Sequence, residues 1–275
     1  MELGDRGKAR LDEAAERFAD ARETMAGRAA DARDAVAGRA ADAREAMGEA
    51  AADAREMAAE AIAKVKPRFR GVTHEYAFFV SLVLGVGLIF LAEGSEARLA
   101  AAIYAASLSA LFGVSALYHV HNWERPSARR WMRRLDHTMI FFLIAGTVTP
   151  FALLVMEGPF ATGLLIAVWV GALAGTIVEL LWTDHPKWVG ALVYIAVGAI
   201  GAVGFPSIAI EAGPVAGALI ALGGALYVTG AIIYAAQRPD PSPAVFGYHE
   251  IFHVLVIAAA AAHFAAVALF ALPAA

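Results

Sequence analysis

The sequence predicts an all-α membrane protein, a seven-transmembrane helix bundle preceded by an Ala-rich helical arm. Of its 275 residues, 60% are hydrophobic and 17% are charged, whereas soluble domains average about 45–50% apolar and about 25% charged residues. The first 66 residues hold 15 of the 26 acidic and 12 of the 22 basic side chains. Beyond residue 75, apolar stretches of transmembrane length recur up to the C-terminus. These three features separate a water-facing segment, 1–66, from a lipid-facing domain, 67–275.

The segment 1–66 is a repeat. The motif ADAR returns every eleven residues, beginning at Ala19, Ala30, Ala41 and Ala52. Eleven residues over three turns is about 3.67 per turn, close to the natural period of an α-helix, so Met25, Val36 and Met47 share one nearly straight stripe. One medium-sized apolar residue per repeat is thin for a coiled coil. We expect a weakly amphipathic, solvated helical arm, with self-association or contact with the membrane surface as the alternatives.

Seven apolar windows follow the arm, and each is near the ~20 residues with which a helix crosses a hydrocarbon core of about 30 Å. The windows are residues 76–92, 99–120, 138–156, 162–182, 188–205, 215–236 and 249–272. Most of the short polar turns between them contain proline, which favours a break between helices. The sequence therefore predicts a multi-pass membrane protein.

The basic residues orient the predicted bundle. Nearly all cations beyond residue 63 precede the first window or lie in alternate turns: Lys64, Lys66, Arg68, Arg70, Arg125, Arg129, Arg130, Arg133, Arg134, Lys187 and Arg238. Cytoplasmic loops carry the excess of Lys and Arg. We therefore expect the N-terminus inside and the C-terminus outside.

Four ionisable residues near the ends of three windows should meet at the cytoplasmic end. His119 ends the second window, Asp136 precedes the third, and His249 and His253 begin the seventh. His249 and His253 lie one helical turn apart, about 6 Å along the axis, so both can reach one ion. Ser115 lies one turn before His119 on the same face. The chain has no cysteine, so a metal must be held by His, Asp or Glu, and three imidazoles with one open position make the ligand set of a catalytic zinc site.

The other polar residues of the predicted bundle are expected outside the ligand set. His263 is about 21 Å along the helix axis from His249, too far to share an ion. His137, on a different face from Asp136, can serve only behind the ligands, and Glu179 is expected to be structural, near a helix end. Three further histidines are expected at the membrane interface: His74, His121 and His185.

Three segments carry a resemblance to a known family. SALYHV (115–120), LDHTMIFFLIAGTVTPF (135–151) and HEIFHV (249–254) resemble, in order and spacing, the signature segments of the hemolysin III family, the bacterial branch of the progestin and adipoQ receptor family that includes the adiponectin receptors. The likeness covers about residues 69 to 275. It implies seven helices, a bacterial cytoplasmic membrane, and a zinc ion held by His119, His249 and His253, with the family's serine and aspartate at Ser115 and Asp136. The wider superfamily includes alkaline ceramidases, which implies hydrolysis of lipid amides.

Two functions remain open for such a site. In a hydrolase acting on an amide or ester of a long-chain lipid, Zn²⁺ would lower the pKa of bound water to about 7. Asp136 would then orient that water and accept its proton, and Ser115 would hydrogen-bond water or substrate; a serine nucleophile is disfavoured because no separate general base is expected beside it. In a receptor or sensor of membrane state, the zinc would be structural. A pore or transporter ranks third because the ionisable residues gather at one end. A membrane lipid is the expected partner, and nothing indicates nucleic acid binding.

Overall fold

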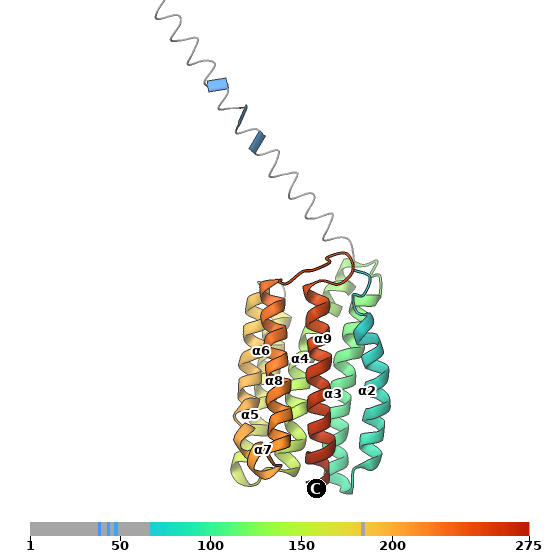
Figure 1. Cartoon of the computed structure of the whole chain (residues 1–275), viewed down its shortest axis with the longest axis vertical. Coiled ribbons are helices and arrows are strands. Elements are labelled where there is room, and N and C mark those ends of the chain that lie inside the picture. Colours follow the sequence, from blue (N-terminus) through green and yellow to red (C-terminus); the bar gives the residue numbers. More distant parts are fainter. Residues whose placement is uncertain (1–37, 40–42, 45–46, 49–66, 183–184, 275) are drawn as a thin grey trace, which may run out of the picture. The chain divides into compact units, whose positions relative to one another are not determined.

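The computed structural model describes residues 38–39, 43–44, 47–48, 67–182 and 185–274 (Figure 1). The predicted arm, 1–66, therefore lies almost entirely outside the described residues. Its few described residues are helical and exposed, among them Met47 of the predicted stripe. Self-association of this segment, or its contact with the membrane surface, stays a prediction.

Residues 67–182 and 185–274 form an all-α bundle, as predicted. The helices are α2 (Val72–Leu91), α3 (Gly94–Val120), α4 (Pro126–Leu154), α5 (Gly158–Leu181), α6 (Lys187–Ala202), α7 (Phe205–Glu211), α8 (Pro214–Ala236) and α9 (Tyr248–Ala266), followed by the short turns η1 (Val267–Ala271) and η2 (Leu272–Ala274). They make seven spans long and apolar enough to cross a membrane, with α6 and α7 together as the fifth, and η1 and η2 extending α9 as the seventh. The chain is a multi-pass integral membrane protein.

The helices begin earlier than the apolar windows do, most clearly in α4. This helix starts at Pro126, a residue suited to the first helical position, and runs through the basic residues that precede the third window. Asp136 therefore lies within α4 and not at its start. Hydropathy marks the part of a helix that contacts lipid or the core, whereas the hydrogen-bonded helix continues into the polar flank.

The seven spans pack into one bundle with α3 and α4 most deeply buried (Figure 1). Aromatic side chains such as Tyr104 of α3 and Phe151 of α4 are fully enclosed. In contrast, α2 exposes large apolar side chains, including Phe90 and Leu91. Because a spanning helix is solvated by lipid, this distribution places α2 at the lipid boundary and buried polar residues such as Ser115 of α3 and Thr149 of α4 inside the bundle.

Alternating helix directions bring seven helix ends to one end of the bundle (Figure 1). The starts of α2, α4, α6 and α9 meet the ends of α3, α5 and α8 there. We call it the basic end, because Arg70, Arg125, Lys187 and Arg238 flank those helix termini. Its placement on the cytoplasmic side stays a prediction.

Candidate metal centre

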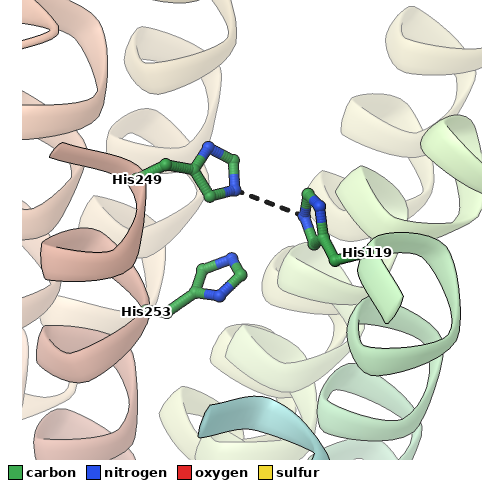
Figure 2. A group of neighbouring side chains, drawn as sticks. All are labelled: His119, His249 and His253. Carbon is green, nitrogen blue, oxygen red and sulfur yellow. Dashed lines mark hydrogen bonds between the residues drawn. The ribbon is translucent and has the colours of Figure 1, made fainter. Parts of the chain in front are cut away.

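Three imidazoles from two helices meet at the basic end. His119 is next to the last residue of α3, and His249 and His253 lie on the first turns of α9. One nitrogen of each ring lies within 4.8 Å of the other two, and Nε2 of His119 is 3.2 Å from Nε2 of His249. Figure 2 shows the three side chains pointing toward one another. The structure thus assembles the predicted ligand set.

The donor set fits a tetrahedral metal ion. Two imidazole nitrogens bound to one zinc at 2.0–2.1 Å lie about 3.3 Å apart, close to the separation between His119 and His249. One nitrogen of His253 lies within 4.8 Å of the ligand nitrogens of both other rings, so small side-chain adjustments bring all three onto one ion. Two buried histidines, His119 and His253, and the half-buried His249 can therefore form a metal site.

Asp136 and Ser115 lie beside the three imidazoles. Oδ2 of Asp136 is 3.4 Å from Nε2 of His119, but the group of mutually close ligand atoms among the described residues contains the three histidines without it. Ser115 is buried one turn before His119, and its Oγ lies 2.8 Å from Nδ1 of His74. Both predicted residues are therefore adjacent to the candidate ligands.

The prediction that His74 is interfacial was wrong. Its side chain is buried, it bonds Ser115, and its ring stacks on His253 with centroids 3.8 Å apart and planes 11° apart. The helix start explains the error: α2 begins at Val72, before the predicted window, so His74 lies in its first turn. Gly71, with φ of +83°, allows close approach to α3, because a Cβ there would lie 2.6 Å from Cβ of His119.

A cavity of about 40 Å³ adjoins the imidazoles. Its polar lining comes from His74, Ser115, Asp136, His137, Tyr194, Tyr234, His249 and His253, and its apolar lining from Leu111, Ile140, Ala231, Phe252 and Val256. A cavity needs about 10–15 Å³ to hold one water molecule. This volume therefore suits a few waters between polar groups and an apolar wall.

A buried ion pair fixes the start of α9. Glu250 lies between His249 and His253 in sequence, is fully buried, and pairs with the guanidinium of Arg70. Its other oxygen, Oε2, accepts a hydrogen bond of 2.8 Å from the backbone N–H of Gly247, a capping contact that stabilises the helix start. The sequence analysis missed this role, although the third helical position is where such a capping glutamate is expected.

A second polar cluster lies on the α5 side of the cavity. His137 lines the cavity, and its Nδ1 lies 2.6 Å from Oε1 of Glu179. The other oxygen of Glu179 lies 2.8 Å from Nε2 of His185, in the loop after α5. Burial alone would lower the pKa of His185, but its bonds with Glu179 and with the Pro186 carbonyl raise that pKa above its usual value. Glu179, which was expected to be structural, thus links His137 at the cavity to His185 in the loop.

Two other histidines, His263 and His121, lie outside the candidate ligand set, where they were expected. His263 is buried elsewhere on α9, where its Nε2 donates a hydrogen bond of 3.1 Å to the carbonyl of Ile220. His121 is exposed just beyond α3. Neither histidine lines the cavity.

Comparison with known proteins gives one consistent relationship. Residues 62–264 match the family described as Haemolysin-III related. Hemolysin-3 of Bacillus cereus is 28% identical over 205 residues, which cover 74% of this chain and 90% of that protein. Hemolysin-3 homolog of Bacillus subtilis (strain 168) is 28% identical over 196 residues, covering 70% and 88%. Monocyte to macrophage differentiation factor of Homo sapiens is 28% identical over 198 residues, covering 71% and 80%.

The family match includes all of α2 to α8 and most of α9, and so contains every residue of the candidate metal centre. It agrees with the likeness that the three sequence motifs indicated. The chain belongs to the haemolysin III-related family.

Proposed function

We propose that this protein is a zinc-dependent hydrolase that cleaves an amide or ester bond of a long-chain membrane lipid at the basic end of its bundle. One observation carries the proposal: the carboxylate of Asp136, two of the three candidate ligands (His249 and His253) and an apolar wall share one cavity of about 40 Å³. This is the size and polarity that suit a reactive water. His119, His249 and His253 would hold the ion.

The residues beside the candidate ligands would have different roles in hydrolysis. A Zn²⁺ ion held by three neutral imidazoles lowers the pKa of a bound water and stabilises charge developing on a carbonyl oxygen. Asp136 lies within reach of that water, because its Oδ2 is 3.4 Å from a nitrogen of His119. It orients the water and accepts its proton as general base. Ser115 donates a hydrogen bond to water or substrate.

The contact between Ser115 and His74 raises a second mechanism, in which Ser115 is the nucleophile. A histidine beside a serine can act as its general base. An effective base is oriented by a third group, and His74 Nε2 has no hydrogen-bond partner among the described residues. The carboxylate Asp136 instead lies near His119. This arrangement favours water as the nucleophile, and Ser115→Ala separates the two mechanisms.

The substrate class follows from the surroundings of the site. The apolar part of the lining includes Leu111, Ile140 and Val256, which come from three different helices. The scissile group would lie at the imidazoles and an acyl chain between these helices. Because the cavity is too small for such a chain, we expect the helices to separate when substrate enters.

The second candidate function is a sensor of membrane state with a structural zinc. The observation that favours it is the number of helices that meet at the site: α3 and α9 supply the imidazoles, α2 supplies His74 and α4 supplies Asp136. An ion there would tie these helices together without turnover.

Fatty-acid release and metal content distinguish the two functions. The full-length protein is purified without chelator and incubated with a mixed lipid extract. We expect about one zinc per chain and zinc-dependent release of fatty acid. Asp136→Asn should keep the zinc but slow release by about 10²–10⁴, the usual contribution of a general base. His119→Ala should lose both, Ser115→Ala should retain most activity, and Glu211→Gln, far from the site, should match wild type.

Three results would contradict these expectations. Unchanged release per zinc in Asp136→Asn refutes the base assignment. Loss of release in Ser115→Ala at full zinc content favours the serine nucleophile. Bound zinc without release from any lipid favours the sensor.

A further inference from the structure

The structure points to a path for protons from the candidate metal centre to the surface. We propose that His137, Glu179 and His185 form a proton relay between the cavity and the loop after α5. The inference rests on the proposed function, because a relay is needed only where a water molecule loses a proton in the cavity.

The three side chains form a continuous chain of short contacts. His137 of α4 lines the same cavity as Asp136 and His249. Its Nδ1 is 2.6 Å from Oε1 of Glu179, and Oε2 of Glu179 is 2.8 Å from Nε2 of His185. Both separations are hydrogen-bond distances. One end of this chain therefore lies at the cavity and the other in a loop at the basic end.

The partners of the buried Glu179 suit proton transfer. Its side chain is only 2% exposed, although it lies within the last turn of α5. A buried carboxylate must be paired, and an arginine would pair more strongly and more durably than histidine. Each oxygen of Glu179 lies within hydrogen-bond distance of an imidazole nitrogen. Unlike arginine, imidazole takes up and releases protons near neutral pH, so this pairing suits transfer as well as stability.

The transfer balances without another reactant. His137 accepts a proton from the cavity at Nε2 and gives the proton of Nδ1 to Oε1 of Glu179. The carboxyl group then turns about its terminal torsion, which is a soft one, and delivers the proton to Nε2 of His185. His185, a half-buried residue of the loop, releases to water the proton of Nδ1, the nitrogen that faces the carbonyl of Pro186. Each group ends with its original charge, and one proton has left the cavity.

A purely structural cluster makes a different prediction. As a structural ion pair, the cluster would hold the loop against α4 and α5, and its loss would lower stability. Added buffer would not correct that loss. A broken relay, in contrast, is restored by a small proton carrier that reaches the cavity when the helices separate to admit substrate. The carrier used is 1,2-dimethylimidazole, whose methyl groups hinder metal binding.

The test uses the full chain in lipid nanodiscs with Glu179→Gln and His185→Gln. Glu211→Gln and His121→Gln are the matched controls, since both residues are exposed and outside the cluster. The first readout needs no substrate: zinc is mixed with metal-free protein at about pH 8, above the pKa of about 7 of zinc-bound water, and proton release is followed with an indicator dye. We expect equal zinc binding in all proteins, and release slowed by about tenfold or more in the two cluster variants.

The second readout is fatty-acid release per bound zinc, with and without the carrier. We expect a similar loss in both cluster variants and its recovery with the carrier. Unchanged proton release in His185→Gln and Glu179→Gln at full zinc content overturns the relay, and so does a loss that the carrier does not restore. If wild type releases no fatty acid but proton release still depends on Glu179, the relay stands and the hydrolase proposal fails. If fatty-acid release proceeds normally in both variants, the relay fails and the hydrolase proposal stands.

Discussion

Removing Arg70 should destabilise the protein more than removing its partner Glu250. The carboxylate of Glu250 is fully buried, whereas the side chain of Arg70 is 26% exposed. In Arg70→Ala the buried carboxylate keeps, among the described residues, only the N–H of Gly247, and breaking a buried pair in this way costs about 3–5 kcal/mol. In Glu250→Ala the guanidinium can turn toward water, so the loss is that of hydrogen bonds to a charged group, about 1.5–3 kcal/mol.

The assay is the free energy of unfolding in mixed micelles, followed by tryptophan fluorescence during a titration with denaturing detergent. Arg70→Ala/Glu250→Ala should unfold within about 1 kcal/mol of Glu250→Ala, since no unpaired charge is left buried. Arg238→Ala, exposed at the same end, is the control. Arg70→Ala should also weaken zinc binding, because Glu250 holds the turn that carries His249. The reasoning is refuted if Arg70→Ala is no less stable than Glu250→Ala, or if the double variant is the least stable of the three.

Three further outcomes are expected. His74→Ala should weaken zinc binding by about 10–100-fold, as for groups that orient metal ligands, measured by competition with a coloured chelator; unchanged affinity would remove His74 from the site. Gly223→Ala should lower stability by about 1–3 kcal/mol, because its Cβ would lie 2.2 Å from the ring of His263, whereas Gly224→Ala meets nothing within 4 Å and should not destabilise. Deleting residues 1–66 should leave an inserted protein with the same zinc content per chain, because the candidate ligands lie outside that segment; zinc loss would show that the segment supports the bundle.

Much of the site could be predicted because a membrane restricts the fold so strongly. In lipid the backbone must satisfy its own hydrogen bonds, so apolar windows of this length become helices. Short turns then make successive helices antiparallel, and the end that each residue reaches follows from counting spans. This reasoning placed His119, Asp136, His249 and His253 at one end. The i, i+4 spacing of the last two histidines placed both on one face of α9.

The sequence by itself determined the class of protein, the number of spans, the family motifs and the residues of the candidate metal centre. Tertiary structure alone decided which residues support that centre. The contact of His74 with Ser115, the pairing of Arg70 with Glu250, and the chain from His137 to His185 each join side chains from different elements. Such contacts depend on how far each helix is rotated about its axis and where its first turn begins. Hydropathy reports neither, because helix rotation is set by the packing of neighbouring helices, and the first turn lies in the polar flank outside the apolar window.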